Sequence, residues 1–226
     1  MTDFLNYKFR CHTLGNFLTD PVAKADPLSK TTLSFLREEW IKVVYGREKI
    51  LSNKYLDKGV QVESDSLDLV KEVTGEKYFK NQKELSNEHI IGIPDVIEKE
   101  EIIDIKSSWD IWTFASVDEK KAKNDYYGQI LGYMMLLGVK KARLMYCLVN
   151  TPEEIINDEM YKASYKNPEL STSNEAAKEF RKNYIFDDIP AKDRLKVFEF
   201  EYDEEVADKL INRIIASRYV MNTMSL

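Results

Sequence analysis

Cysteine and histidine are scarce in this sequence, and their scarcity excludes several kinds of site. Cys11 and Cys147 are the only cysteines among 226 residues, and His12 and His89 are the only histidines. Two cysteines cannot supply a disulfide framework, a four-thiolate zinc site or an iron–sulfur cluster with four cysteine ligands. Because zinc is bound mainly by cysteine and histidine, the sequence also argues against a catalytic zinc ion.

Long apolar runs and glycine-rich loops are missing too. No run approaches 18 apolar residues, and the start, MTDFLNYKFR, lacks the apolar segment of a signal peptide, so we expect a soluble, cytoplasmic protein. The eight glycines form no phosphate-binding loop. The net charge of −6 argues against a broad basic surface for nucleic acid, although it leaves room for a local basic groove.

The length and an apolar content of 43% suit one folded domain with a substantial core. Apolar periodicity and turn residues predict the elements in chain order. These are a short helix or turn near 9–18, helices at 29–52 and 59–74, strands at 77–81, 88–97 and 101–108, a helix at 118–137, a strand at 142–149, a helix at 173–184 in the otherwise irregular stretch 150–194, a strand at 195–202 and a helix at 203–221. The strand–helix–strand unit predicts two parallel strands with a helix packed on the sheet.

The most informative stretch runs from Glu88 to Ser108, EHIIGIPDVIEKEEIIDIKSS. Two runs rich in Ile and Val flank a short acidic turn, which predicts a β-hairpin. With the turn centred on its middle peptide, Asp95 faces Asp104 on one side of the sheet, with Cβ atoms about 5 Å apart. Pro94 removes a donor from the strand and therefore predicts a bulge or an end of pairing beside these acids.

Two opposed carboxylates destabilise a sheet unless something cancels their charge. A hard divalent cation such as Mg²⁺ takes carboxylate oxygens and would do so. Lys106 follows Asp104 by two residues and projects from the same face, whereas Ile103 and Ile105 project from the other face. The hairpin thus places two acids and a lysine at one spot on an otherwise apolar element.

Two helices carry polar side chains on apolar faces. In the helix at 59–74, Glu63 shares a face with apolar neighbours, where it is either harmless at the edge or bound to a partner or a metal. In the helix at 118–137, Gln129 and Tyr133 form an i, i+4 pair, a pattern usually found in core packing with polar tips at its rim. Gly128 and Gly132 repeat at the same spacing, which predicts a close approach of this helix to the sheet.

The order Pro94-Asp95, hairpin, Asp104-Ile105-Lys106 resembles the PD-(D/E)XK nuclease motif. The wider sequence resembles the phage-type exonucleases of that superfamily, the YqaJ-like viral recombinases related to phage lambda exonuclease. The gap between the two acids is shorter than in lambda exonuclease, and the second acid is Asp instead of Glu. The resemblance implies a restriction-endonuclease-like α/β/α core, in which helices flank a central mixed sheet of four to five strands.

The resemblance also implies a site. In the family, a glutamate that follows a lysine–glycine start on the first core helix completes the metal site, and Glu63 matches it. The implied Mg²⁺ or Mn²⁺ ligands are then Glu63, Asp95, Asp104 and the main-chain carbonyl of Ile105. Lys106 is the implied catalytic lysine, which orients the attacking water or neutralises the transition state. Gln129 matches a glutamine-x-x-x-tyrosine motif that supports this lysine.

Three further residues are candidates for substrate binding, beside Tyr133. Relatives of lambda exonuclease hold the 5′ phosphate with an arginine near the N-terminus, and Arg10 is the matching position, with Thr13 nearby. From the residues alone, Arg10 is equally an exposed surface side chain. Trp112 follows the hairpin and either stacks on bases or pins its loop onto the core.

The sequence as a whole predicts one PD-(D/E)XK domain over 1–226, with a core at about 55–150, an N-terminal helical part at 1–54 and a C-terminal insertion, strand and helix at 151–226. It predicts a metal-dependent 5′-to-3′ exonuclease on linear double-stranded DNA in phage-type recombination. Alternatives are a structure-specific endonuclease on the same core and a non-catalytic DNA-binding module. The resemblance further implies a single-strand annealing protein as partner, a trimer, and the cytoplasm of a bacterial host.

Overall fold

The computed structural model describes residues 3–23, 26–49 and 54–226, with side chains in the helix α3 (Lys54–Gln61) described from Lys58 onward. The chain folds around a sheet of order β4-β5-β6-β7, in which β5 and β6 are parallel and the outer pairs are antiparallel. These strands are β4 (Val96–Ile97), β5 (Glu101–Ser107), β6 (Lys141–Cys147) and β7 (Leu195–Glu201). The helix α6 (Glu119–Leu137) makes the predicted crossover from β5 to β6.

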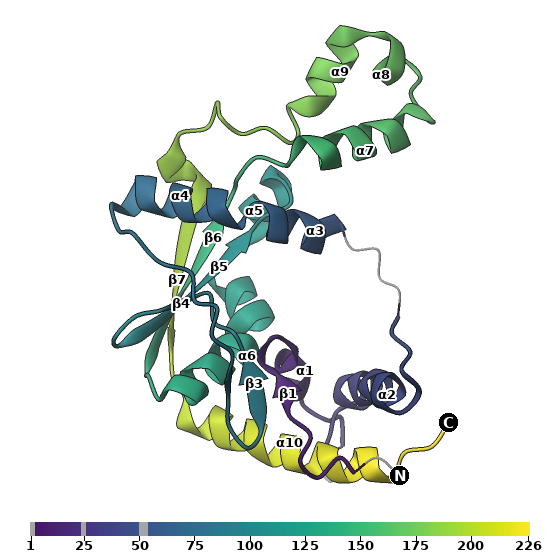
Figure 1. Cartoon of the computed structure of the whole chain (residues 1–226), viewed down its shortest axis with the longest axis vertical. Coiled ribbons are helices and arrows are strands. Elements are labelled where there is room, and N and C mark those ends of the chain that lie inside the picture. Colours follow the sequence, from purple (N-terminus) through teal and green to yellow (C-terminus); the bar gives the residue numbers. More distant parts are fainter. Residues whose placement is uncertain (1–2, 24–25, 50–53) are drawn as a thin grey trace.

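Helices cover both faces of this sheet (Figure 1). The helix α4 (Glu63–Thr74) packs Val70 against Ile103 and Met145 on one face. On the other face, Ile102 and Leu144 join a larger apolar cluster with α6 and with the helix α10 (Glu204–Thr223). Neighbouring residues of β5 therefore point into different layers, as strand geometry requires. The predicted α/β/α core with a mixed sheet is confirmed.

The hairpin has the predicted register. Val96 pairs with Ile103, and Ile97 pairs with Ile102. Asp95, one residue before β4, therefore stands opposite Asp104. The register follows from the apolar alternation, because a slip by one residue would turn Ile103 out of the α4 layer and put Asp104 into it.

The predicted strand at 88–97 is divided between two sheets. Its first part, β3 (Ile90–Gly92), lies in a three-stranded sheet of order β1-β3-β2, with β1 (Phe9–Arg10) and β2 (Leu85–Ser86). Its second part is β4 in the main sheet. Pro94 lies in the gap between them, where pairing stops as predicted.

Two predictions about the segments before the hairpin are wrong. The helix expected at 59–74 is divided into α3 and α4, because Val62, with φ −100° and ψ 16°, leaves the helical conformation between them. The segment 77–81 is not a strand. It runs beside the hairpin through a single backbone hydrogen bond, in which Asn81 N donates to Asp95 O at 2.7 Å.

The N-terminal part forms short helices and one long helix. They are the 3-10 turn η1 (Cys11–Thr13), α1 (Gly15–Leu18) and α2 (Lys30–Tyr45). Ser29 caps α2 as predicted, and Gly46 ends it in the left-handed conformation, with φ +62°. The expected continuation to 52 is not helical at 46–49, and its last residues lie outside the described ranges.

The glycines of α6 face the N-terminal segment instead of the sheet. A Cβ atom on Gly128 would lie 2.5 Å from Gly15 N, and one on Gly132 would lie 2.5 Å from a methyl group of Leu14. The expectation of a close approach to the sheet is therefore wrong. The missing side chains let the start of α1 lie directly on α6.

The last helix holds the first residues in place. Arg218 on α10 donates from Nε to Tyr7 O at 2.9 Å and from a terminal nitrogen to Glu88 O at 2.6 Å. Phe4 N donates to the Asn222 side chain at 3.0 Å. These bonds join the N-terminal segment, the turn before β3 and the C-terminal helix.

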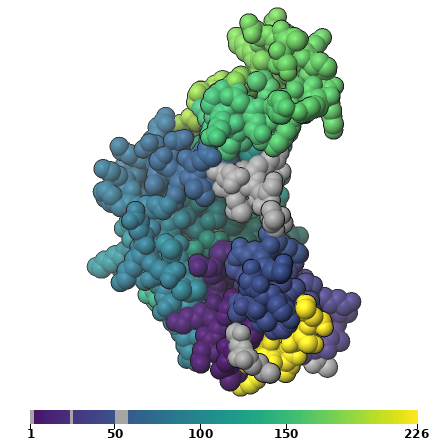
Figure 2. Space-filling view, turned by 45° about the vertical axis from the view of Figure 1, so that its right-hand side comes forward, coloured from purple at the N-terminus to yellow at the C-terminus, as the bar shows by residue number. Residues whose placement is uncertain are grey.

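A helical extension follows β6 and stands apart from the sheet, at the upper end of the molecule (Figures 1 and 2). It consists of α7 (Glu153–Ser164), α8 (Glu169–Thr172) and α9 (Asn174–Arg181), and the chain returns to β7 through η2 (Ala191–Arg194). The expectation of a helix near 173–184 is met by α9, whereas α7 lies in a stretch predicted to be irregular. None of the described helices is both long and apolar enough to cross a lipid bilayer.

Candidate active site

The hairpin brings its two acids and its lysine together. Asp95 accepts a hydrogen bond from Ile105 N at 2.8 Å, which fixes its carboxylate beside β5. Asp104 is 1% exposed, and its Oδ2 atom lies 2.7 Å from Lys106 Nζ. The gap at Pro94 frees Asp95 from ladder pairing, so its side chain can bond to the neighbouring backbone.

The charges in this cluster are strongly coupled. Burial, together with the nearby Asp104 carboxylate, raises the pKa of Asp95 to about 6. Burial opposes the charge on Lys106, but the carboxylates of Asp104 and Asp95 outweigh it and raise the pKa of the ammonium above its usual range. Lys106 is therefore protonated in the metal-free protein.

Helix α6 supplies the next layer of the cluster. Gln129 donates from Nε2 to Asp104 Oδ1 and to Tyr133 Oη, both at 3.1 Å. Burial, followed by the charge of Asp104, raises the pKa of the Tyr133 hydroxyl above its usual range. The structure thus places the predicted Gln129–Tyr133 pair behind Asp104, and Gln129 contacts the acid instead of the lysine.

The donors present fit a hard divalent cation. Asp104 Oδ2 is buried, and the partner that faces it is the Lys106 ammonium, 2.7 Å away. Two carboxylates on one sheet face repel each other, and oxygen ligands of this kind suit Mg²⁺ or Mn²⁺. The Ile105 carbonyl lies between Asp104 and Lys106 in β5, as the implied ligand set requires.

Glu63 is engaged elsewhere. It begins α4, which covers the sheet face opposite to α6, and it forms an ion pair with Lys80. Among the described residues, no group of three or more His, Cys, Asp and Glu side chains converges closely enough to hold a metal ion. The structure thus brings Asp95 and Asp104 together, whereas the Glu63 carboxylate pairs with Lys80.

The N-terminal candidates lie on the rim of this cluster. Arg10 ends β1 and is 3.9 Å from a Glu84 carboxylate oxygen, with 60% of its side chain exposed. Thr13 donates to Arg10 O at 2.7 Å and so closes η1. A Cβ atom on Gly92 would lie 2.7 Å from the Tyr133 ring and 2.8 Å from Cys11 Sγ, so the N-terminal turn lies beside the Tyr133 end of the cluster.

Trp112 is held out toward solvent. It lies on α5 (Ile111–Ser116) and is 77% exposed. Asp110 caps this helix by accepting from Thr113 N at 2.7 Å. Lys196 on β7 donates to three carbonyls of the helix and its end. The helix that carries Trp112 is thus fixed, although the ring itself is free of the core.

Sequence reasoning did not single out Lys58 or Lys80. Lys58 is 1% exposed, and its Nζ donates to Trp109 O at 2.9 Å, with the Trp109 and Phe186 rings 5.9 and 5.5 Å away. Burial lowers the pKa of Lys58 to about 7. Lys58 is 51 residues from its partner Trp109, and Lys80 is 17 residues from its partner Glu63, so the local periodicity of the sequence predicts neither contact.

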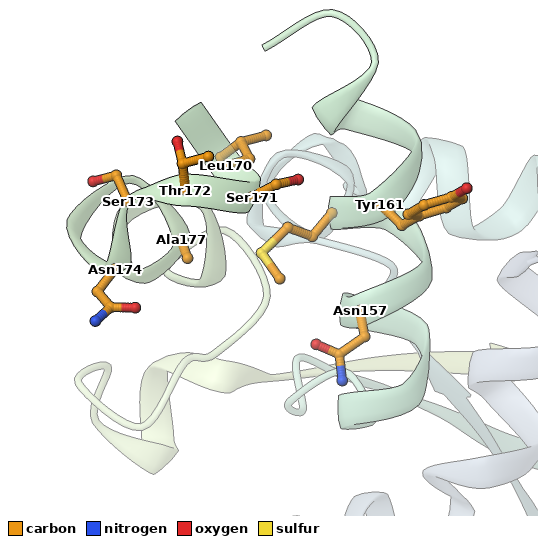
Figure 3. Close-up of a pocket in the computed structure, with 9 residues that line it drawn as sticks. Asn157, Tyr161, Leu170, Ser171, Thr172, Ser173, Asn174 and Ala177 are labelled. Carbon is orange, nitrogen blue, oxygen red and sulfur yellow. The ribbon is translucent and has the colours of Figure 1, made fainter. Parts of the chain in front are cut away.

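A hollow of about 350 Å³ lies in the helical extension, away from the acid pair (Figure 3). Asn157 lines it from α7, and Ser171 and Thr172 line it from α8. Its lining side chains are uncharged. Neither the acid pair nor Lys106 lines this hollow.

Comparison with known proteins identifies solved structures with a similar fold. No protein-family model and no curated protein matches the chain. Among solved structures, a phage-related exonuclease from Haemophilus somnus 129PT is similar, with 27% identity, a TM-score of 0.80, and coverage of 96% of this chain and 94% of that chain. The alkaline exonuclease LHK-Exo from Laribacter hongkongensis shares the fold, with 13% identity, a TM-score of 0.63, and coverage of 95% and 88%.

A second structure of LHK-Exo contains dAMP and matches with 14% identity and a TM-score of 0.63, over 96% of this chain and 89% of that chain. These neighbours are exonucleases, and they support a nuclease. The comparisons thus confirm the resemblance that the hairpin indicates: the chain has the fold of the phage-type exonucleases of the PD-(D/E)XK superfamily.

Proposed function

We propose that this protein is a Mg²⁺- or Mn²⁺-dependent deoxyribonuclease that degrades linear double-stranded DNA from its 5′ ends, in phage-type recombination or DNA processing. The observation that carries the proposal is the pair of the half-buried Asp95 and the buried Asp104 beside Lys106. A protein that only bound DNA would gain nothing from opposed carboxylates, which repel both each other and phosphate.

The side chains of the cluster have separate roles in this proposal. Asp95, Asp104 and the Ile105 carbonyl would hold the metal, with Glu63 as a further ligand. When bound, the metal supplies a water of lowered pKa and stabilises the charge that develops on the phosphate. Gln129 keeps the Asp104 carboxylate in place through its hydrogen bond. Lys106, kept positive by its acidic neighbours, orients the attacking water or balances the charge on the phosphate.

Substrate contacts come from the rim. Arg10 is exposed at the end of β1 and would bind the 5′ phosphate, with Thr13 supporting its backbone. Trp112 offers an exposed ring beside the end of β5 on which a base can stack. LHK-Exo, which shares the fold, binds dAMP in one of its structures.

Digestion of end-labelled linear duplex DNA with Mg²⁺ tests the proposal. Substrates with and without a 5′ phosphate are compared for the native protein, Lys106→Ala and, as a matched control on the exposed part of α6, Lys120→Ala. Stepwise loss from 5′ ends that Lys106→Ala abolishes and Lys120→Ala preserves is the expected result. Loss from 3′ ends would overturn the polarity and the role of Arg10.

Closed circular DNA separates the alternatives. Cleavage of intact circles would replace the exonuclease with an endonuclease on the same core. If no DNA is cleaved, and calorimetry shows no Mg²⁺ or Mn²⁺ binding that depends on Asp95 and Asp104, the protein is a non-catalytic DNA-binding module.

We also propose a single-strand annealing protein as partner, because an exonuclease that acts from 5′ ends leaves a single strand for annealing. A homotrimer around DNA is proposed on the resemblance alone. Sedimentation velocity with and without duplex DNA tests it, and monomers at all concentrations would exclude a ring.

A further inference from the structure

Lys80 pairs with Glu63, the carboxylate that the proposed function adds to Asp95 and Asp104 as a metal ligand. Its Nζ forms an ion pair with Glu63, and 43% of the Lys80 side chain and 30% of the Glu63 side chain are exposed. Ion pairs with this exposure contribute little to stability, because water and salt screen them. Such a contact is therefore easily exchanged for a stronger one.

The backbone fixes Lys80 beside the acid pair. The next residue, Asn81, donates from its backbone N to Asp95 O at 2.7 Å and from its side chain to Pro94 O at 3.0 Å. Of two adjacent residues, Lys80 thus contacts Glu63 and Asn81 contacts Asp95. An unanchored surface lysine would have no such constraint.

The position of Glu63 is fixed in the same way. One turn further along α4, Ser66 Oγ shares a hydrogen bond of 2.7 Å with Ser107 Oγ on β5. Ser107 follows Lys106, so the start of α4 lies near the end of the strand that carries the acids. The helix that carries Glu63 is therefore fixed against the end of β5, while the Glu63 carboxylate itself pairs with Lys80.

Resting on the proposed metal-dependent function, we propose that Lys80 is a positioning residue that holds Glu63 in the metal-free protein and competes with the divalent cation for its carboxylate. Glu63 joins Asp95 and Asp104 only when Lys80 has been displaced. A divalent ion has twice the charge of an ammonium and coordinates carboxylate oxygens directly, so it displaces a partly exposed lysine. The ion pair with Lys80 fixes the position of the Glu63 side chain and lowers the affinity of the site for the metal.

Calorimetric titration with Mn²⁺ in the absence of DNA tests this inference. Lys80→Ala should bind Mn²⁺ about two- to fivefold more tightly than the native protein, the size expected when a partly exposed ion pair no longer competes. Lys80→Arg keeps the charge and should bind like the native protein. Lys77→Ala removes a charge from the same segment, where Lys77 Nζ lies over the Phe79 ring, and should also leave the affinity unchanged.

A second set of variants isolates the contact. In a Glu63→Gln background, Lys80→Ala should not change Mn²⁺ affinity, because the carboxylate for which lysine and metal compete is gone. Thermal unfolding of each variant confirms that it is folded.

The inference is overturned if Lys80→Ala binds Mn²⁺ no more tightly than the native protein, if Lys77→Ala gains as much, or if the gain persists with Glu63→Gln. These results leave the proposed function intact, provided that native binding depends on Asp95 and Asp104. Absence of any such binding in the native protein would instead refute the metal site, and this inference with it.

Discussion

Because Lys58 is buried, we expect the free energy of unfolding to depend on pH, and replacing Lys58 should remove this dependence. Lys58 is 1% exposed, and its ammonium donates a hydrogen bond to Trp109 O. Burial lowers its pKa from 10.5 to about 7, although Asp110 partly offsets the effect. With about 1.4 kcal/mol for each pKa unit, the shift corresponds to roughly 5 kcal/mol of unfolding free energy.

The sign follows from proton binding. Between pH 7 and 10.5 the unfolded chain holds a proton on Lys58 that the native protein has released, so the free energy of unfolding rises with pH across this window. Below pH 7 both states hold the proton, and the full destabilisation is present. Lys58→Met removes the titration and also the hydrogen bond from Lys58 to Trp109 O, whose loss costs about 1 to 3 kcal/mol. The variant should therefore be more stable than the native protein at pH 7, by about 2 to 4 kcal/mol.

Urea unfolding of the metal-free protein at pH 6, 7, 8 and 9 measures the effect. The advantage of Lys58→Met should shrink by about 1.4 kcal/mol per pH unit above pH 7. Lys120→Met, at an exposed lysine on α6, should follow the native profile at every pH. Parallel profiles for the native protein and Lys58→Met would refute the reasoning.

Three further changes probe packing, charge and substrate binding. Gly128→Ala should destabilise the protein by about 1 to 3 kcal/mol in urea unfolding, because its Cβ would lie 2.5 Å from Gly15 N. Gly59→Ala has open space around its Cβ and should not destabilise the protein. Equal effects of the two substitutions would contradict the close packing at Gly128. Asp95→Asn should be more stable than the native protein above pH 6, on the order of 2 kcal/mol, because the raised pKa of Asp95 makes native stability fall as pH rises through 3.8 to 6. The same variant should lose Mn²⁺ binding in calorimetry, and retained binding would exclude Asp95 as a ligand. Trp112→Ala should keep its melting temperature but bind duplex DNA about five- to a hundredfold more weakly by anisotropy; unchanged affinity would remove the ring from the interface.

The parts that sequence predicted well are those in which neighbours in the chain are neighbours in space. The hairpin register follows from the turn and from the alternation that buries Ile103, and it alone places Asp95 opposite Asp104. The i, i+4 spacing likewise places Gln129 beside Tyr133. These relations depend on helix and strand geometry and on no distant contact.

The parts that sequence missed depend on distant partners. The strand β1 exists because Phe9 pairs with Ile90, and no periodicity in two residues announces that pairing. The contact of Gly128 with Gly15, and that of Lys80 with Glu63, likewise join segments whose approach only the assembled fold determines. The sequence could therefore name Glu63 as a candidate, but not its present partner.

The contacts of α10 with the first residues have a consequence for the protein's synthesis on the ribosome. Phe4 and Tyr7 leave the ribosome well before their hydrogen-bond partners, Asn222 and Arg218, which are made more than 200 residues later. The three-stranded sheet cannot be closed against α10 until then, and such long-range contacts form late. The hairpin, in contrast, is complete once β5 has emerged. Folding should thus begin at the hairpin, and the N-terminal phosphate-binding candidates should reach their places only once α10 has emerged.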